Sequence, residues 1–405
     1  MCNKNATFVM NFMMTVRNIY IYACCLLVFL SACQQQSRKP EMTPWGTAMG
    51  EDSLPQESSL SLDDIQMNGE FIMLTVSGPE SYYDYHGHGM GTQYLLCQNF
   101  ADKLGVSLRV EVCKDTTELV QRMQKGEGDL AAVLLPKKWN RLLYAGVTDK
   151  LHHTSWIVRK DGQDLAQALN SWYHPDMINK IKREEQFLLS TASIRRHVYA
   201  PMLNRAGGVI SCYDHLFQRY APLARWDWRL LAAQCYQEST FDPKAHSWAG
   251  ACGLMQIMPS TADHVGLPRD KLYDPEANIA CAVKYIQELS GFFRDVPASE
   301  RIYFVLASYN GGHFHVRDAM ALACRDGRDP HRWGEVEPYI LKLSSPAYYT
   351  NSVVRYGYMR GFETVDYVRH IRARWYQYRE VAKKGGSSGF STMPERAKRR
   401  YKWHL

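Results

Sequence analysis

The stretch 228–262 constrains the fold of this chain more than any other. Its first part predicts a helix, because Leu231 and Cys235 recur at helical spacing without an intervening Gly or Pro, and Glu238 continues the same apolar stripe. Polar residues and a proline at positions 239–243 then end the helix, so Glu238 falls in its last turn. Poor solvation and the negative end of the helix dipole would raise the pKa of this carboxyl and keep it protonated, as a general acid requires.

An isolated Glu at a helix end is usually an exposed surface carboxylate, so the residues that follow decide the interpretation. Segment 250–256, G-A-C-G-L-M-Q, places two glycines around a short apolar run, where the backbone can approach other groups closely. Segment 307–312, A-S-Y-N-G-G, ends an apolar helix and presents Tyr309 and Asn310 at its exit. Aromatic, amide and backbone groups of this kind bind sugar rings.

These blocks, in this order, resemble the lytic transglycosylase domain of the soluble lytic transglycosylase type. The pair E-S at Glu238-Ser239, G-L-M-Q at 253–256 and Y-N-G-G at 309–312 match three of its motifs, and E-T-V-D-Y-V at 363–368 matches the fourth. The resemblance covers about residues 213–371 and implies an all-α lysozyme-like catalytic domain. We expect this domain to span residues 208–382.

The resemblance also implies which residues carry the chemistry. Glu238 would be the catalytic acid and base, and no metal or cofactor would be needed. The substrate, peptidoglycan glycan strands, would be bound by Ser239, Gly253, Leu254, Met255, Gln256, Tyr309, Asn310 and Tyr367. Ser239 would orient the Glu238 carboxylate or the acetamido group of the sugar. No second acid stands out near Glu238, since Asp242 is expected to structure the turn, and ordinary glycoside hydrolases use two carboxylates.

Three functions fit these residues. In a lytic transglycosylase the C6 hydroxyl of N-acetylmuramic acid closes onto C1, which gives a 1,6-anhydro end without water. A lysozyme-type murein hydrolase on the same fold is an alternative, and so is a murein-binding sensor whose catalytic domain is inert. The intact Glu238 argues against the sensor.

Length and charge leave room for more than this domain. A chain of 405 residues predicts two or three domains. The net charge of +7 suits a partner that bears carboxylates, such as peptidoglycan stem peptides, as well as it suits nucleic acid. No zinc-finger spacing or glycine-rich phosphate loop is present in the sequence, so we predict no nucleic-acid partner.

The first 33 residues predict a targeting segment. The apolar run 19–30 is too short to span a bilayer, and L-S-A-C at 30–33 closes it with small residues before a cysteine. This resembles a bacterial lipoprotein signal, which implies an acylated Cys33 and a lipid anchor. Gln34 would favour the outer membrane, with the protein facing the periplasm of the cell envelope. Segment 34–68 predicts a flexible tether, because it is rich in Gln, Ser, Pro and Glu.

Residues 69–207 predict an α/β domain. Strands are expected at 71–76, 106–112 and 129–135, and helices at 91–104 and 116–125, which implies a parallel sheet. About residues 69–160 resemble the first lobe of type-3 periplasmic solute-binding domains. The region from 136 to 207 looks too short for a second lobe, so we expect a partial lobe with stem peptide or muropeptide as its candidate ligand. Y-Y-D-Y-H at 82–86 is expected to be its first loop, and Gly207-Gly208 the hinge to the catalytic domain.

The combination of a solute-binding-like and a transglycosylase domain resembles the membrane-bound lytic murein transglycosylases of type F. The other residues that could carry chemistry are less informative. His86 and His88 alternate with glycine and lack further ligands at usable spacing, which favours a solvated loop over a metal site. Cys235 and Cys252 lie in apolar patterns and are expected to be buried. Segment 383–405 predicts a basic, solvated tail.

Overall fold

The structure of the protein is a computed structural model that describes residues 61–384. The predicted signal segment 1–33 with Cys33, the tether as far as residue 60 and the tail beyond 384 lie outside the described residues. Within residues 61–384, no helix combines the length and the apolar character needed to cross a membrane.

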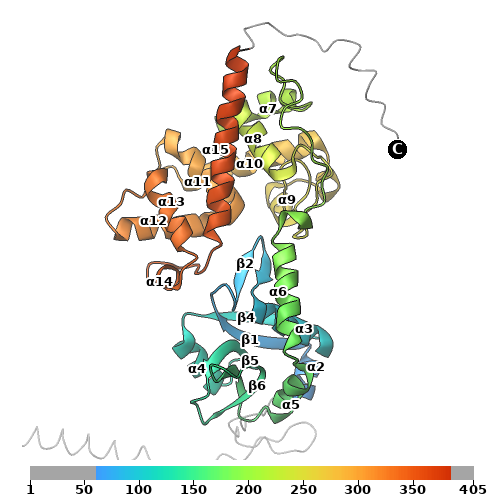
Figure 1. Cartoon of the computed structure of the whole chain (residues 1–405), viewed down its shortest axis with the longest axis vertical. Helices are drawn as coiled ribbons and strands as arrows, with labels where there is room; N and C mark the ends of the chain where they lie inside the picture. The colour runs from blue at the N-terminus through green and yellow to red at the C-terminus, as the bar shows by residue number, and fades with distance from the viewer. Residues whose placement is uncertain (1–60, 385–405) are drawn as a thin grey trace, which may run out of the picture. The chain divides into compact units, whose positions relative to one another are not determined.

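The described chain begins with alternating helices and strands and continues with helices alone (Figure 1). The α/β part contains α2 (Leu62–Asn68), β1 (Glu70–Val76), β2 (Tyr83–Tyr85), β3 (His88–Met90), α3 (Thr92–Leu104), β4 (Ser107–Cys113), α4 (Thr116–Gln124), β5 (Leu130–Pro136), β6 (Leu142–Asp149), β7 (Thr154–Arg159), α5 (Gln163–Trp172), α6 (Asp176–Leu188) and η1 (Thr191–Ser193). The helical part contains α7 (Asp214–Tyr220), η2 (Ala221–Ala224), α8 (Trp228–Ser239), α9 (Pro259–Val265), η3 (Arg269–Lys271), α10 (Pro275–Phe292), α11 (Ala298–Gly311), α12 (His313–Arg325), α13 (Trp333–Lys342), α14 (Pro346–Tyr349) and α15 (Gly361–Lys384). The predicted order of an α/β part before an all-α part is confirmed.

Helix α2 lies inside the segment that the sequence predicted to be tether. The Ser61 hydroxyl accepts a hydrogen bond from the Asp64 backbone N–H at 3.2 Å, and the Asp64 carboxylate accepts one from the Ser61 N–H at 2.9 Å. This reciprocal cap fixes the first turn of the helix. Ile65 is buried in the core of the α/β part. The prediction of a tether as far as residue 68 was therefore wrong for its last seven residues, 62–68.

The main sheet has five strands in the order β4-β1-β5-β7-β6. Strand β1 is parallel to both β4 and β5, and all three strands lie where the sequence predicted them. Strand β7 is antiparallel to β5 and to β6, so the sheet is mixed and the prediction of a parallel sheet holds for three strands only. Only a short turn separates β6 from β7, and such a connection allows an antiparallel pair but not a parallel one. Residues 142–159 thus extend the first sheet.

Helices cover both faces of this sheet. On one face, α2, α3, α5 and α6 enclose a core that includes Phe71, Phe100 and Trp156. On the other face, α4 packs Leu119 and Met123 against the strands. This three-layer arrangement buries the central strands β1 and β5, which is why their sequences are largely apolar runs, while the edge strand β4 alternates apolar and polar residues.

A second, two-stranded sheet is formed by β2 and β3, in the segment that the sequence predicted to be a loop. Tyr83 pairs with Met90 and Tyr85 with His88. The turn residues His86 and Gly87 both have positive φ angles, 52° and 80°. Two positive φ angles in a two-residue connection are typical of the type I′ turn, which matches the twist of a hairpin.

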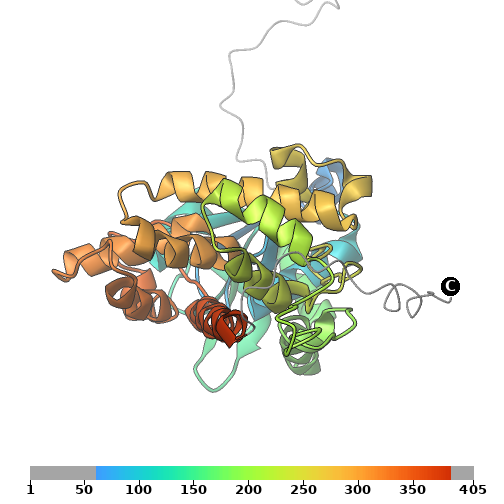
Figure 2. The same cartoon turned by 90° about the horizontal axis from the view of Figure 1, so that it is seen from above.

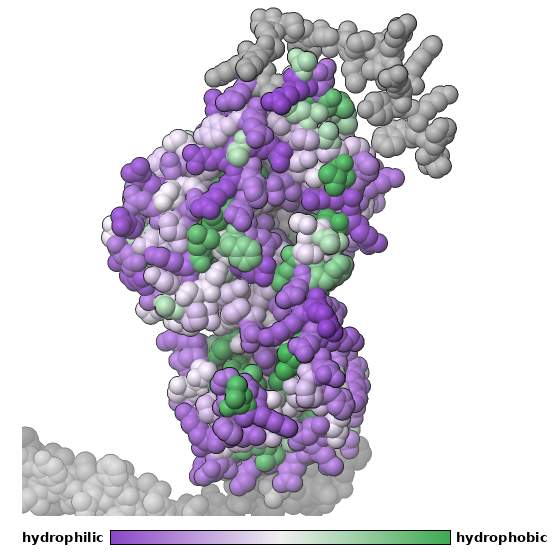
Figure 3. Space-filling view, viewed as in Figure 1, coloured by the Kyte–Doolittle hydropathy of each residue, from purple (hydrophilic) through white to green (hydrophobic). Residues whose placement is uncertain are grey.

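The helical part is built around α8 and α15. Helix α15 packs against α8, α11 and α13 (Figure 2). Their shared core includes Leu231, Leu306, Val365 and Ile371, each exposed by 1% or less. In the view of Figure 3, hydrophobic surface residues form small separate groups on a largely hydrophilic surface.

The connection between the two parts is bonded to the helical part well before the predicted hinge at Gly207-Gly208. Arg195 and His246 exchange backbone hydrogen bonds of 2.9 and 3.0 Å. The Tyr378 hydroxyl of α15 donates to the Pro201 carbonyl at 2.7 Å. Residues 195–201 therefore belong structurally to the helical part, although the sequence boundary at 207 assigns them to the α/β part.

Candidate active site

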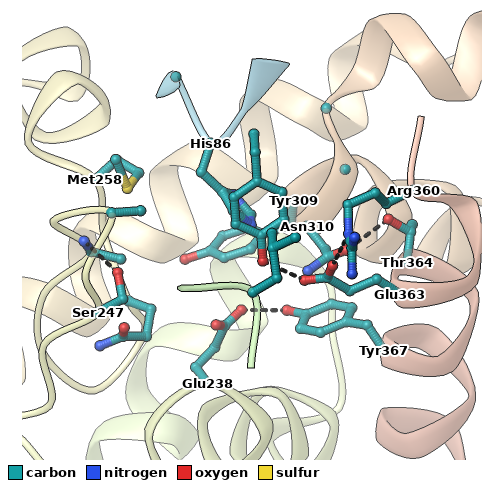
Figure 4. A pocket seen from close by; sticks show the side chains of 18 of the residues that line it. His86, Glu238, Ser247, Met258, Tyr309, Asn310, Arg360, Glu363, Thr364 and Tyr367 are labelled. Atoms are coloured by element: carbon teal, nitrogen blue, oxygen red, sulfur yellow. Dashed lines mark hydrogen bonds and ion pairs between the residues drawn. The ribbon is translucent and has the colours of Figure 1, made fainter. Parts of the chain in front are cut away.

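A cavity of about 760 Å³ opens at the C-terminal end of α8. Its walls come from segments far apart in the sequence: the end of α8, the loop between α8 and α9, the junction of α11 and α12, the start of α15 and the β2–β3 hairpin. Glu238 reaches into this cavity between Ser247 on one side and Tyr367 on the other (Figure 4).

Glu238 is held by a hydrogen bond and surrounded largely by protein atoms. The Tyr367 hydroxyl donates to its Oε1 at 2.5 Å. Burial raises the pKa of Glu238 from its ordinary value of 4.5 to about 7, although the Tyr367 hydrogen bond and the positive charge of Arg196 both act to lower it. The direction agrees with the prediction from the sequence. A carboxyl group with this pKa can both donate and accept a proton near neutral pH.

The end of α8 is fixed by several polar contacts, so the Glu238 backbone cannot shift freely. Thr240 and Phe241 have positive φ angles of 53° and 66°, which turn the chain sharply after the helix. The Thr240 hydroxyl donates to the His197 carbonyl at 2.9 Å, and the Asp242 carboxylate accepts from the His197 N–H at 2.6 Å. The Arg196 guanidinium donates to the Glu238 carbonyl at 3.0 Å. Asp242 thus structures the turn, as predicted.

The G-L-M-Q segment forms a tight turn that is clamped from behind. The side-chain oxygen of Asn278 accepts from the Met255 N–H at 2.8 Å, and its amide donates to the Leu272 and Cys252 carbonyls at 2.7 and 3.0 Å. The Tyr309 hydroxyl donates to the Met255 carbonyl at 2.8 Å. These bonds connect the turn to α10 and α11. Asn278 is a supporting residue that the sequence did not reveal, because an Asn in a helix carries no local signal of such a role.

Five of the predicted site residues meet in the cavity: Glu238, Gln256, Tyr309, Asn310 and Tyr367. Asn310 accepts a hydrogen bond from the Thr364 hydroxyl at 2.7 Å, which fixes the orientation of its amide.

The other predicted residues lie behind the wall of the cavity. Leu254 and Met255 are fully buried, and Gly253 leaves no space for a side chain. The Ser239 hydroxyl donates to the Cys235 carbonyl of its own helix at 3.1 Å. That bond turns the hydroxyl toward its own helix, whereas the sequence predicted that it orients the carboxylate or the acetamido group of the sugar.

Polar groups without partners gather around this cavity. Among residues 61–384, the buried atoms Ser308 Oγ, His315 Nδ1 and Gln234 Oε1 lack a hydrogen-bond partner. Ser308 and His315 line the cavity, and the Gln234 amide donates to the Tyr367 hydroxyl at 3.2 Å. Burial lowers the pKa of His315 to about 4, so its ring is neutral at neutral pH. Buried polar atoms normally have partners, so these are candidates for contacts with a ligand. The sequence predicted no role in the site for Ser308, His315 or Arg196.

The described residues contain no group of three or more His, Cys, Asp or Glu side chains placed to hold a metal ion. Cys235, Cys252 and Cys281 are buried free thiols.

Comparison with protein families supports the helical part directly. The transglycosylase SLT domain family matches residues 215–329. This range includes Glu238, Gln256 and Tyr309 and ends before Tyr367, which lies on α15.

Curated relatives extend the similarity beyond that domain. A protein of Aeromonas hydrophila subsp. hydrophila named membrane-bound lytic murein transglycosylase F is 27% identical, and the alignment covers 79% of this chain and 84% of the relative. A protein of the same name from Desulfosudis oleivorans is also 27% identical, over 78% of this chain and 91% of the relative. One from Yersinia pestis is 33% identical over 64% of this chain and 54% of the relative.

Two solved structures resemble one part of the chain each. The 70 kDa soluble lytic transglycosylase of Escherichia coli is 27% identical with a TM-score of 0.29, over 44% of this chain and 26% of that structure. Domain 1 of an arginine-binding protein, TmArgBP, is 19% identical with a TM-score of 0.25, over 30% of this chain and 98% of that structure.

Proposed function

We infer that this chain is a lytic murein transglycosylase that resembles the membrane-bound type F. The SLT family match covers residues 215–329, while relatives named for this activity align over more than three quarters of the chain, beyond the catalytic domain alone. The single observation that carries the proposal for the site is the Glu238 carboxyl, which faces a cavity at the end of α8 with a pKa raised to about 7.

The first step is a proton transfer from Glu238. Near neutral pH about half of the molecules carry the proton on this carboxyl, so it can protonate the oxygen that links N-acetylmuramic acid to the next N-acetylglucosamine. The bond between C1 and that oxygen breaks, and the sugar leaving group takes the proton. Positive charge develops at C1 of the muramic acid. Tyr309, Asn310 and Gln256 line the same cavity and are placed to orient the sugar during this step.

The second step uses the substrate as its own nucleophile. The C6 hydroxyl of the muramic acid attacks C1, and the Glu238 carboxylate takes the hydroxyl proton. A new bond joins C1 to O6, the acid is regenerated, and no water is consumed. The nucleophile belongs to the ring that it attacks, so its effective concentration is high.

A lone catalytic acid supports this reaction over hydrolysis. Ordinary glycoside hydrolases use a second carboxylate as nucleophile or base. The other carboxylates that line the cavity are Asp84, Glu363 and Asp366. Glu363 is bonded to Tyr85 and Arg360, and Asp84 accepts from the Gly87 N–H at 3.0 Å. These bonds occupy two of the three candidates for a second catalytic group.

Product analysis tests the proposal. We expect purified full-length protein to convert murein into fragments that end in 1,6-anhydro sugars, one water lighter than hydrolysis products and resistant to borohydride reduction. Mass spectrometry after digestion in heavy-oxygen water is the measurement. Reducible ends that contain the heavy isotope would instead identify a lysozyme-type hydrolase.

The pH dependence is a second prediction. Because the proton donor must be protonated, kcat/KM should fall as the pH rises through about 7, roughly tenfold per pH unit beyond it. In Tyr367→Phe, the lost hydrogen bond no longer lowers the pKa of Glu238. The fall in kcat/KM, the alkaline limb of the pH profile, should therefore move to higher pH. Tyr309→Phe is the matched control, because its hydroxyl bonds to the Met255 carbonyl and its limb should stay in place. If kcat/KM fell at the same pH in wild type and in both variants, the titrating group would not be Glu238.

The place of action follows from the relatives and from the substrate. The protein acts at the cell envelope, and peptidoglycan is its substrate class. We further propose that an acylated Cys33 anchors it to the outer membrane, that Ser239 and 253–255 support the glycan site, and that the α/β part binds stem peptide or muropeptide.

A further inference from the structure

The β2–β3 hairpin of the α/β part contributes residues 83–87 to the cavity that contains Glu238. Figure 4 shows His86 entering the cavity from the side opposite Glu238. The same view has Ser247 and Met258 on one side of Glu238 and Arg360 and Glu363 on the other. We call these two sides the loop rim, residues 247–258, and the helix rim, residues 356–364.

The hairpin is bonded to the loop rim. The His88 Nε2–H donates to the Ala249 carbonyl at 2.9 Å. The Tyr85 ring lies parallel to the Trp248 ring, with an interplanar angle of 2° and centroids 6.0 Å apart. His88 also contacts Trp248, at 5.4 Å between ring centroids.

The hairpin is also bonded to the helix rim. The Tyr85 hydroxyl donates to Glu363 Oε1 at 2.7 Å, while Arg360 Nε pairs with the other oxygen of Glu363 at 3.2 Å. The Tyr83 ring meets the Tyr358 ring edge to face, 5.1 Å between centroids. Tyr83 and Tyr358 are both buried and share a small apolar cluster. Tyr85 thus contacts both rims at once.

This arrangement has a consequence for a polymer substrate. A glycan strand laid sideways into a cleft needs an open face along the whole cleft. Here the hairpin crosses from the loop rim to the helix rim above Glu238. It is attached to each rim by a hydrogen bond and a ring contact. With the hairpin in place, a strand cannot be laid sideways onto Glu238 and has to enter end first.

We propose that the β2–β3 hairpin acts as a strap that restricts the enzyme to cleavage from the ends of glycan strands. This inference rests on the proposed function, because it takes the substrate to be murein. It assigns Tyr85 and His88 as residues that determine specificity, through their bonds to Glu363 and Ala249.

Loosening the strap tests the proposal. The double variant Tyr85→Phe/His88→Ala removes one hydrogen bond to each rim and keeps the Tyr85 ring framework. Each bond stabilises the closed strap modestly, so the open fraction should rise by about tenfold in total. The matched control is Tyr144→Phe/His152→Ala, whose groups bond within the α/β part, to Trp139 and Asp149.

The readout is the length distribution of soluble products from purified sacculi at early times, measured by chromatography for the full-length protein. Wild type and the control are expected to release disaccharide units from the start. The double variant should release intermediate-length fragments first, enriched several-fold over wild type. The single Tyr85→Phe, the smaller change, should shift the distribution in the same direction.

Three results would overturn the strap. The first is release of intermediate-length fragments by wild type, and the second is an unchanged disaccharide pattern in both variants. The third is faster release with the same pattern, which would mean that the hairpin only blocks access to the site. The chemistry of the product ends reports on the proposed function separately. Reducing ends would refute transglycosylation, whereas fragment length would still decide about the strap.

Discussion

Replacement of Glu238 by Gln is expected to lower kcat on murein by about 10³-fold, in the range ascribed to a general acid. Gln has nearly the same shape, and its oxygen can still accept the Tyr367 hydroxyl, so the cavity should persist. It cannot deliver a proton to the glycosidic oxygen or remove one from the C6 hydroxyl. The measurement is the rate of anhydro product formation. Glu288→Gln, which alters an exposed pair with His264 on the same domain, is the control and should keep full activity.

Stability distinguishes loss of chemistry from loss of fold in this variant. The folded-state pKa of Glu238, about 7, lies above its ordinary value of 4.5, so burial disfavours the ionised form. Wild type therefore loses stability as the pH rises from about 4.5 to 7, and the loss persists at higher pH. Glu238→Gln removes this charge. Its free energy of unfolding at pH 8, from denaturant titration, should equal or exceed that of wild type, and clear destabilisation would contradict the burial argument.

Replacement of Gly253 by Ala is expected to destabilise the helical part by about 3 kcal/mol. The Gly253 φ angle is +77°, which an L-residue rarely adopts, and an added Cβ would lie 2.5 Å from the Leu272 carbonyl oxygen and 2.6 Å from the Asn278 amide nitrogen. These groups belong to the clamp behind the G-L-M-Q turn, so the turn that carries Gln256 should shift as well. Denaturant unfolding and product formation should both report the change.

Gly266→Ala separates the backbone effect from the steric effect. Its φ angle is +86°, close to that of Gly253, but nothing lies within 4 Å of the added Cβ. We expect it to cost about 1 kcal/mol, as for a non-glycine residue in the left-handed region at a helix end. Similar losses in the two variants would mean that the close approach at Gly253 contributes little.

The sequence predicted the elements whose patterns are local. Strands β1 and β5 have continuous apolar runs, β4 alternates apolar and polar residues, and α8 has both an apolar stripe and a clear stop after Glu238. The capping residues Ser61 and Asp64 were also a local signal, but the polar composition before them hid it. The β2–β3 hairpin was missed as well, because its strands are only three residues long and its turn is His86-Gly87 instead of the usual Asn-Gly or Asp-Gly.

The parts of the site that the sequence did not predict depend on contacts between segments far apart in the chain. The side chain that binds Glu238 is 129 residues further along the chain, and no spacing rule relates the two. Asn278 lies 23 residues from the Met255 N–H that it holds. The hairpin meets Glu363 across 278 residues. Motif matches did place Tyr367 and Glu363 near the site, but they could not indicate that Tyr85 would bond to one of them.

The position of Tyr367 on α15 ties the site around Glu238 to the folding of one helix. This helix also contributes Val365, Val368 and Ile371 to the core of the helical part. A state in which α15 has come away from α8 and α11 lacks both the partner of Glu238 and one wall of the cavity. The geometry around Glu238 is therefore complete only when this helix is docked, so local unfolding of α15 would remove the hydrogen bond to the acid and one wall of the cavity in a single step.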